Sequence, residues 1–347
     1  MSVYALAKRA LFSTARYSGL NWFFRQVLGR EGVLVLCYHG VVPREYSNQL
    51  FLYRNTVSER EFGRQLEFLV RHFRPIAARD LIDHIRLGTS LKPRTVLVTF
   101  DDGYRNNLTL AAPLLSRYGV PALISVTTGY IGTPKVLWPD EVNLRVLDWP
   151  LASIPYPSMD GKFAMVPLAS GQDPRIFHAE KIRALCKALP EQALGMYLDT
   201  LRREPCPALD SRDRDLFDFL NWDEVRSLVA AGFDIASHTV SHPILTQIGR
   251  DRLDDELRES KRRIEAATGK ACECLVYPNG QSADFSPQVA EAARQAGYLL
   301  GFSLTGSYAC TRADAFALSR ISVPGHQPEA VFEARASGLH TWMQKIL

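Results

Sequence analysis

Two adjacent carboxylates, Asp101 and Asp102, follow an apolar run that is typical of a buried strand, and a glycine comes directly after them. Neighbouring side chains of a strand point to opposite faces, so the pair can face one site only if the strand ends before it. Charges at the end of a buried strand are costly unless a cation or a function compensates them. The alternative is a polar turn in which the aspartates cap the next helix. A metal site here therefore needs ligands from elsewhere in the chain.

A second group with metal-binding chemistry is the pair His238 and His242, which follows the predicted strand Phe233–Ala236. Their spacing lets both imidazoles reach one ion if the segment turns helically. Alone, such a pair is more often hydrogen-bonded in a loop. Both motifs follow predicted parallel strands, however, and the carboxyl ends of such strands share one face. Two histidines and one aspartate leave positions open for water and substrate, and the second aspartate is then suited to removing a proton from metal-bound water.

Two further predicted strands end in residues that suit the same face. Tyr277, Pro278, Asn279 and Gly280 form a tight turn, and backbone N–H groups in such a turn can bind an oxyanion. Pro278 has no N–H, so Tyr277 or Asn279 has to donate; the alternative is a plain Pro-Asn-Gly turn. His39 ends the first predicted strand. A lone histidine there is more often structural, but on this face it could be a general acid.

These motifs resemble those of the polysaccharide deacetylases of carbohydrate esterase family 4. The resemblance rests on Thr-Phe-Asp-Asp-Gly at 99–103 and Ser-His-Thr-x-x-His at 237–242, and it covers roughly residues 33–323. It implies an α/β fold, a distorted (β/α) barrel of about seven parallel strands. It also implies that Asp102, His238 and His242 hold a divalent metal, usually zinc, that Asp101 is the general base, and that the Tyr277 backbone N–H helps to bind the oxyanion. The implied reaction removes an N-acetyl group from an amino-sugar glycan and releases acetate.

The chain departs from the pattern of this family in two places. Val276 stands where the third motif of the family often has an arginine that orients the catalytic base. The late Leu-x-His motif that supplies the general acid is absent, because neither His326 nor His340 follows a suitable strand. One branch of the family is circularly permuted, carries an early Tyr-His element and includes enzymes that act on poly-N-acetylglucosamine. Tyr38-His39 matches that element, so the resemblance assigns the general acid to His39.

Substrate contacts and some alternatives stay open in the sequence. Tyr104 and Trp222 are the chosen candidates for stacking against a sugar ring, and Trp138 and Tyr130 are others; aromatic residues near a barrel mouth are as often part of the core. The same metal chemistry would serve a carbohydrate O-acetyl esterase. A third reading is a catalytically silent carbohydrate-binding relative, which the missing arginine supports.

Strand and helix signals alternate along most of the chain, which favours a parallel α/β architecture. The other predicted strands are Val33–Tyr38, Thr95–Phe100, Pro121–Val126, Cys274–Tyr277, Tyr298–Ser303 and Phe316–Val323. A proline-rich stretch at 138–219 interrupts the alternation and is predicted to be an insertion with a helix near Ile176–Leu189. We therefore expect an N-terminal segment (1–31), a barrel in two parts (32–137 and 220–325) around the insertion, and a C-terminal tail or helix (326–347).

Composition excludes several classes of protein. The 347 residues are 46% hydrophobic and 22% charged, and the net charge of +4 is too small to indicate a nucleic-acid partner. No stretch approaches the roughly 20 apolar residues that span a bilayer. The six cysteines contain no C-x-x-C pair, which favours buried thiols in a reducing compartment.

The N-terminal segment combines basic and apolar residues. Lys8, Arg9 and Arg16 interrupt the apolar run that a signal peptide needs, so no cleaved signal is predicted. The composition of residues 1–30 suits a basic amphipathic helix on an anionic membrane surface, although a helix packed on the surface of its own domain is the favoured alternative. We expect a cytoplasmic protein, with the membrane surface as a second location. The sequence does not indicate an oligomeric state.

Overall fold

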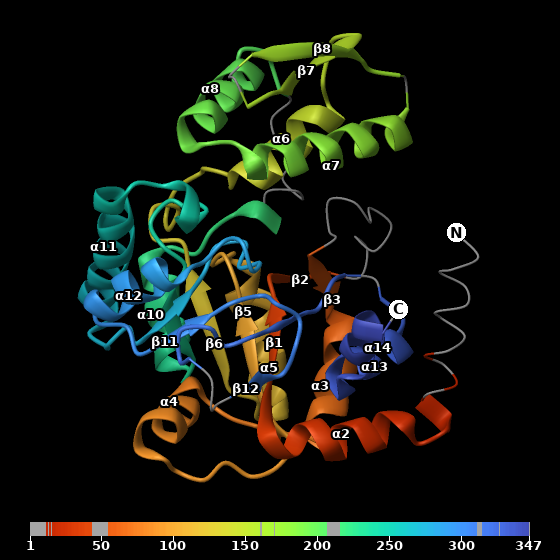
Figure 1. Cartoon of the computed structure of the whole chain (residues 1–347), viewed down its shortest axis with the longest axis vertical. Coiled ribbons are helices and arrows are strands. Elements are labelled where there is room, and N and C mark those ends of the chain that lie inside the picture. The colour runs from red at the N-terminus through yellow and green to blue at the C-terminus, as the bar shows by residue number, and fades with distance from the viewer. Residues whose placement is uncertain are drawn as a thin grey trace.

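A curled sheet with helices on its outside forms the centre of the molecule, and a smaller α/β unit lies above it (Figure 1). The computed structural model describes residues 12, 14, 16–43, 55–159, 162–169, 171–206, 216–310, 314–325 and 327–346. His326 and all of residues 1–11 fall outside these ranges, so the prediction for residues 1–30 is tested only from residue 12 onward. The fold class predicted from the sequence, an α/β barrel with about seven parallel strands, is confirmed.

The central sheet has nine strands, and seven of them lie side by side in parallel. In spatial order these are β11 (Leu300–Phe302), β10 (Cys274–Val276), β9 (Asp234–Ser237), β6 (Ala122–Val126), β5 (Thr95–Phe100), β1 (Gly32–Tyr38) and β13 (Ile321–Ser322). β4 (Arg74–Pro75) pairs in parallel with the start of β5, and β12 (Ala309–Cys310) runs antiparallel to β1. β1 and β5 are buried along almost their whole length, as expected for parallel strands covered on both faces.

The segment that leads into β13 links the last strand of the curled sheet to the first. Leu318 donates its N–H to Gly301 and accepts from the N–H of Ser303, at 3.0 and 2.8 Å, so it pairs with β11. Val323, just beyond β13, donates its N–H to the Cys37 carbonyl of β1 at 2.9 Å. This segment therefore occupies the gap between β11 and β1, and it carries Arg320.

Alternation along the strands separates two cores. Val33, Val35 and Leu97 pack inside the curl with α4 (Ala78–Leu87), whereas Leu34 and Leu36 pack against the outer helices. The outer helices are α3 (Glu59–His72), α5 (Ala112–Tyr118), α10 (Trp222–Ala230), α11 (Arg250–Thr268) and α12 (Pro287–Gln295). The π-helical turn η2 (Asn107–Ala111) precedes α5, and β2 (Gly40–Val42) pairs with β3 (Thr56–Ser58) beside the barrel.

The smaller unit corresponds to the proline-rich part of the chain. It contains α6 (Trp138–Leu147), the antiparallel pair β7 (Ser153–Pro157) and β8 (Phe163–Pro167), α7 (Gln172–Ala188) and α8 (Glu191–Arg202). Val146, Ile154, Ile182 and Tyr197 belong to a core of its own. We call this unit, residues 138–206, the insertion. The β7–β8 pair was not predicted, because three prolines in these strands argue against strand structure in a sequence.

The N-terminal helix α2 (Leu20–Glu31) packs on the surface of the domain, against α13 (Glu329–Ser337) and α14 (Leu339–Ile346). The Ser337 hydroxyl donates to Asn21 at 3.2 Å, and the rings of Phe24 and Trp342 lie 5.2 Å apart. Trp22, Phe23 and Val27 on the same helix stay exposed. None of the helices in the described ranges is long and apolar enough to cross a membrane.

Candidate active site

A cavity of about 340 Å³ lies where the carboxyl ends of β1, β5, β9 and β10 meet the insertion, and this volume is typical of small-molecule sites. The polar and charged side chains around it come from both units. Its lining comprises His39, Asn55, Asp101, Asp102, Leu137, Trp138, Pro139, Asp140, Arg183, Lys187, His238, His242, Ile244, Asn279, Gln281, Leu304 and Ser322. The prediction that the strand-end motifs share one face therefore agrees with the geometry.

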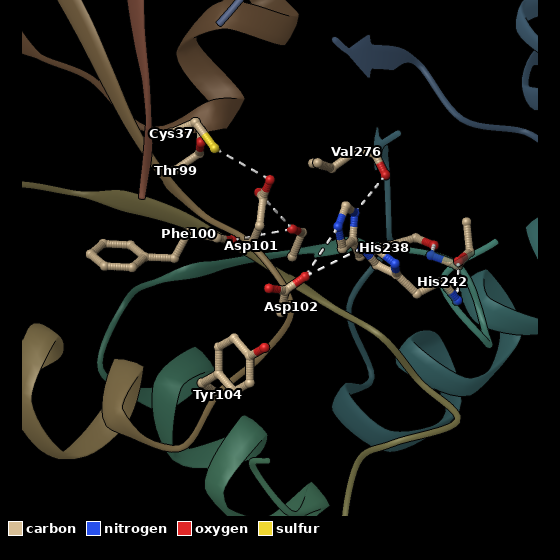
Figure 2. Close-up of polar contacts among 12 residues, drawn as sticks. Cys37, Thr99, Phe100, Asp101, Asp102, Tyr104, His238, His242 and Val276 are labelled. Carbon is tan, nitrogen blue, oxygen red and sulfur yellow. Dashed lines mark hydrogen bonds and ion pairs between the residues drawn. The ribbon is translucent and has the colours of Figure 1, made fainter. Parts of the chain in front are cut away.

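Asp101 and Asp102 both face this cavity because β5 ends at Phe100. The Asp101 N–H still donates to Tyr38 of β1, at 2.9 Å, so the backbone of Asp101 stays in register with the sheet. Asp102 has a left-handed conformation with φ 75°, which turns its carboxylate toward the histidines. Figure 2 shows the result, with Asp101 directed toward Cys37 and Asp102 toward the two imidazoles. Adjacent residues thus reach two different sets of partners.

The loop after β9 brings His238 and His242 together without a helical turn. Thr239 and His242 both have positive φ, 69° and 61°, and the His242 N–H donates to the Thr239 hydroxyl at 3.1 Å. The imidazole centroids lie 4.8 Å apart at 69°. Left-handed conformations of non-glycine residues are strained and cluster at functional sites. The helical geometry considered for this spacing is therefore not the one that the chain adopts.

Glu256 of α11 holds the histidine loop in place, and sequence reasoning did not find it. Its buried carboxylate accepts from the N–H groups of Val240 and Ser241, at 2.7 and 2.9 Å, and from the Ser241 hydroxyl at 2.5 Å. On the other side of the loop, the N–H of Gly129 donates to the Val240 carbonyl at 2.8 Å. The side chain of any other residue at 129 would collide with that carbonyl. No local pattern identifies Glu256, which lies in the middle of a charged helix.

Asp102, His238 and His242 form a donor set that fits a divalent metal. The Nε2 atoms of both histidines lie 3.5 Å from Asp102 Oδ1, and the candidate ligand atoms are all within 4.8 Å of one another. His238 Nδ1 lies 2.8 Å from the Val276 carbonyl, which can only accept, so Nδ1 carries a hydrogen. In its neutral form, which metal binding requires, His238 directs the lone pair of Nε2 toward the Asp102 carboxylate, where a cation would lie between two acceptors.

The pKa shifts within this group favour an ionised Asp102 and a neutral His242, and a protonated His238. Burial opposes ionisation of Asp102, but His238, His39 and His242 lower its pKa below the usual range. Burial also opposes a charge on His238, but its hydrogen bond to Asp102 and the charges of Asp101 and Asp102 raise its pKa, so a metal would have to displace a proton from His238. Burial and the neighbouring His238 lower the pKa of His242 to about 4. His242 is therefore neutral at pH 7, which is the form of imidazole that binds metals.

Arg320 is the most important residue that sequence reasoning missed. Its guanidinium donates to both oxygens of Asp101, from Nη1 to Oδ1 at 2.6 Å and from Nη2 to Oδ2 at 2.8 Å. Nε and Nη1 also donate to the Ser303 carbonyl and the Thr99 hydroxyl, both at 3.1 Å. Arg320 is only 1% exposed, so this is a fully buried bidentate pair. The arginine that the sequence lacks at Val276 comes instead from the segment that closes the barrel.

The Asp101 carboxylate is held in its ionised form. Burial alone would raise its pKa, but Arg320 and then His238 bring the pKa far below the usual range. The Ser125 hydroxyl and the Cys37 thiol also donate to it, at 3.1 and 3.3 Å. Cys37, His39 and Asp101 are the only other residues of the described ranges that could group around a metal. Because Arg320 already occupies both Asp101 oxygens, this second group is a poor site for a cation.

His39 lies where a proton donor to the same cavity would be needed. It follows β1, is half-buried, and offers a ring nitrogen within 4.8 Å of an Asp101 oxygen. Its location agrees with the sequence-based prediction, whereas the role as general acid stays a prediction. Of the two histidines considered and rejected, His340 is buried and stacks on Phe12, with ring centroids 5.5 Å apart.

The prediction that the Tyr277 N–H binds an oxyanion is wrong. That N–H donates to the Phe302 carbonyl of β11 at 3.0 Å, because the strand pairing continues one residue past Val276. The Tyr277 hydroxyl donates to Phe316 at 2.8 Å, and its ring stacks on Phe285 in the core. Asn279, the other donor considered for this turn, does line the cavity and has a left-handed φ of 61°.

The two predicted sugar-stacking residues do not line the cavity either. Tyr104 is buried, its ring stacks on Phe219 at 5.1 Å, and its hydroxyl donates to Asp140 at 2.6 Å. Trp222, the first residue of α10, packs against the outer core. Of the four aromatic candidates, all of which lie in described ranges, Trp138 of the insertion is the one that lines the cavity. Tyr104 therefore contacts a residue that lines the cavity, Asp140, and Trp222 packs on the outer core of the barrel.

Comparisons with known proteins agree with this geometry. A family model described as polysaccharide deacetylase matches residues 88–148 and 191–301, which include both aspartates and both histidines. Residues 149–190, most of the insertion, lie in the gap between the two matched ranges. None of the curated proteins matches the chain.

Three solved structures share the fold. The structure of the Streptococcus pyogenes deacetylase PplD in complex with acetate has 15% identity and a TM-score of 0.55, covering 84% of this chain and 92% of that one. IcaB from Ammonifex degensii has 21% identity and a TM-score of 0.55, covering 88% and 97%. A de-N-acetylase from Aggregatibacter actinomycetemcomitans has 19% identity and a TM-score of 0.52, covering 87% and 99%. The family match and the shared fold together support placing this chain in the polysaccharide deacetylase family.

Proposed function

We propose that this protein is a metal-dependent hydrolase that removes N-acetyl groups from an amino-sugar glycan and releases acetate. The observation that carries the proposal is that two adjacent aspartates at one cavity have different partners. Asp102 lies within reach of two imidazole nitrogens, and Asp101, one residue away, is ionised and held by Arg320. A ligand and a base in adjacent positions are the parts that metal-assisted hydrolysis requires.

Asp102, His238 and His242 would hold the metal, for which zinc is the first choice because zinc favours nitrogen and carboxylate ligands with an open position. When bound, such a metal polarises the acetyl carbonyl and lowers the pKa of a coordinated water. The other groups of the site belong to this chain alone. The hydrogen bond from His238 Nδ1 to Val276 fixes which nitrogen faces Asp102, as partners of ligating histidines commonly do.

Asp101 would take a proton from the attacking water. Arg320 donates to each Asp101 oxygen and so fixes the plane of the carboxylate, and Ser125 and Cys37 donate to one oxygen each. The Cys37 thiol is the weakest of these donors, so the attacking water would have to take its place on Oδ2. His39 would protonate the leaving amine, since an amide nitrogen leaves poorly without a proton. The Asn279 backbone would replace Tyr277 as the donor to the oxyanion. The alternative of a catalytically silent carbohydrate-binding relative was supported by the missing arginine, and Arg320 removes that support.

The proposal is tested by acetate release from N-acetylated and O-acetylated oligosaccharides. We expect acetate from an N-acetylated substrate, its loss after chelation, and its recovery when the metal returns. Asp101→Asn should abolish the activity, whereas Asp251→Asn, a charge change on the exposed start of α11, should not. Release from O-acetylated substrates alone would identify an esterase. Absence of acetate from every substrate, with metal bound, would refute an enzymatic function.

We also propose that α2 rests on an anionic membrane surface. Trp22, Phe23 and Val27 are at least half exposed, and Trp22 borders a cavity lined by four arginines and three glutamates. Aromatic side chains beside cations suit the interface of such a membrane. Sedimentation with vesicles should increase with phosphatidylglycerol content and fall for Trp22→Ala/Phe23→Ala. Equal sedimentation with neutral and anionic vesicles would contradict the proposal.

A further inference from the structure

A second cavity, of about 470 Å³, lies between α2, α3 and α13. Figure 1 shows these three helices together beside the barrel, away from the insertion. The described residues that line it are all different from those of the active-site cavity, and four arginines and three glutamates are among them. Its volume is in the range of small-molecule sites. This cavity is therefore a separate place where a charged molecule could bind.

Arg25 of α2 is the buried cation of this cavity. It is 8% exposed, and its guanidinium carbon lies 5.5 Å from the centre of the Phe68 ring of α3. Among the residues that the structure describes, Arg25 has no partner in a hydrogen bond or an ion pair. A guanidinium has five N–H donors, and burying it without acceptors is costly. Acceptors for Arg25 therefore have to come from a molecule in the cavity.

The surroundings of Arg25 disfavour its charge. Burial lowers its pKa and Arg94 adds to this effect, while Glu333 and Tyr308 oppose it only in part. Burial also lowers the pKa of His72, which lines the same cavity, and the charge of Arg25 is the largest of three arginine charges that lower it further. Both shifts indicate that an anion in this cavity would be stabilised.

The three glutamates of the lining have other arginines as partners. Their ion pairs are Arg16–Glu329 at 3.1 Å, Arg16–Glu333 at 3.2 Å and Arg71–Glu67 at 3.2 Å. None of these carboxylates comes within ion-pair distance of Arg25. Arg64, an exposed residue of α3 that lines the same cavity, likewise has no ion pair within the described ranges. Guanidinium groups from two helices are thus available to one ligand.

Asn21 supplies a second buried donor at this cavity. It lies one turn before Arg25 and so on the same face of α2. Its side chain is 3% exposed, and the Ser337 hydroxyl donates to its Oδ1 at 3.2 Å, which orients the amide. The Nδ2 atom is buried and has no acceptor in the described part of the chain. Buried polar groups are rarely left in this state, and such groups often mark a ligand site.

We propose that Arg25 and Arg64 bind a phosphate group in this cavity, and that the phosphate belongs to the headgroup of an anionic lipid. A phosphate offers several oxygens in the geometry that a guanidinium matches. Trp22 borders the same cavity and is 59% exposed, and its indole suits the headgroup region of a membrane. The lipid source of the phosphate rests on the membrane contact proposed for α2, whereas the phosphate site itself does not.

The test is calorimetric titration of the full chain with three soluble probes: inorganic phosphate, dihexanoyl phosphatidylglycerol below the concentration at which it forms micelles, and dihexanoylglycerol, which lacks the phosphate. We expect one saturable site for the phospholipid, weaker binding of inorganic phosphate at the same site, and no binding of dihexanoylglycerol. Equal affinity for the phospholipid and inorganic phosphate would keep the phosphate site but overturn its lipid source. Binding of neither phosphate probe, or equal binding of dihexanoylglycerol, would overturn the inference.

Variants identify the residues that bind the phosphate. Arg25→Gln should weaken phospholipid binding at least about tenfold, because a charge-assisted hydrogen bond contributes about that much, and Arg25→Lys should restore part of the affinity. Arg64→Gln should also weaken binding, and it serves as the second test if Arg25→Gln does not fold, since Arg64 is exposed. Arg60→Gln is the matched control, an exposed arginine of α3 that does not line the cavity. Wild-type affinity in folded Arg25→Gln or in Arg64→Gln would contradict the role of that arginine.

The phosphate site and the membrane contact of α2 can fail separately. Sedimentation with vesicles measures the contact, and titration with the soluble probes measures the site. If the soluble phospholipid binds but vesicles of phosphatidylglycerol do not sediment the protein, the membrane contact fails and the phosphate site stands. If the vesicles sediment the protein but neither phosphate probe binds, the membrane contact stands and the phosphate site fails.

Discussion

The buried pair of Arg320 and Asp101 gives the sharpest prediction from the structure. Arg320→Met replaces the guanidinium by an apolar chain of similar length, and it leaves the Asp101 carboxylate ionised and without its bidentate partner in a site where it is 3% exposed. The Ser303 carbonyl and the Thr99 hydroxyl lose donors as well. The perturbation therefore acts on stability and on the orientation of the proposed base.

The size of the effect follows from burial. Removing one partner of a fully buried ion pair costs about 3–5 kcal/mol, because the other charge stays uncompensated. Asp101→Asn is costly for the same reason, since it leaves the Arg320 charge behind. The double variant removes both charges, so its cost should be smaller than the sum by about 2–3 kcal/mol. For activity, loss of orientation should lower kcat about 100-fold, with the metal content unchanged.

The assay is a double-mutant cycle by denaturant unfolding of wild type, Arg320→Met, Asp101→Asn and the double variant, with acetate release and metal content of Arg320→Met measured in parallel. The exposed pair Arg294–Asp314, with Nη2 at 2.8 and 3.0 Å from the two carboxylate oxygens, is the matched control and should couple by less than about 1 kcal/mol. Additive effects at Arg320 and Asp101 within about 0.5 kcal/mol would refute the reasoning. So would wild-type kcat in a folded Arg320→Met protein.

Two further predictions concern groups that support the barrel. Glu256→Gln should lower metal affinity about tenfold, because the two N–H groups of the histidine loop share Oε2 and would donate to a neutral oxygen, while the Ser241 hydroxyl loses its acceptor Oε1. A metal-competition titration checks this against Glu259→Gln on the exposed side of α11, and unchanged affinity would contradict it. Burial raises the pKa of Asp234 although the Ala78 N–H donates to it. A raised pKa means that ionisation costs stability as pH rises from about 4 through the folded value. Asp234→Asn should therefore be more stable than wild type at pH 7, and the difference in the free energy of unfolding should vanish toward pH 3. Denaturant unfolding at several pH values measures this difference. A variant that is less stable than wild type at pH 7 would contradict the prediction.

Much of the barrel and the metal-binding group follows from local patterns. Thr95–Phe100 has the predicted bounds, and the motifs after β5 and β9 meet because parallel strands end at one edge. The sequence alone does not show how Asp101 and Asp102 separate, since this depends on the left-handed φ of Asp102. That conformation is unfavourable for a residue with a side chain and is held by the surrounding fold.

The errors arise where residues distant in sequence meet. Arg320 lies 219 residues from Asp101, and only the closure of the barrel brings the two together. A signal was present, because Phe316–Val323 was a predicted strand with one arginine, but its neighbours in the sheet were unknown. Tyr277 was misassigned because the ladder with β11 uses its N–H. Trp138 lines the cavity because of how the insertion folds, and the proline-rich sequence of the insertion gives few signals from which its secondary structure can be predicted.

The central claim is that two adjacent aspartates do different work, Asp102 as a metal ligand and Asp101 as a base. The most direct measurement is zinc stoichiometry together with acetate release for Asp101→Asn and Asp102→Asn. We predict that Asp101→Asn retains about one equivalent of zinc and loses acetate release, whereas Asp102→Asn loses both, because it removes the only anionic ligand of the set. Equal retention or equal loss of zinc in the two variants would contradict the account.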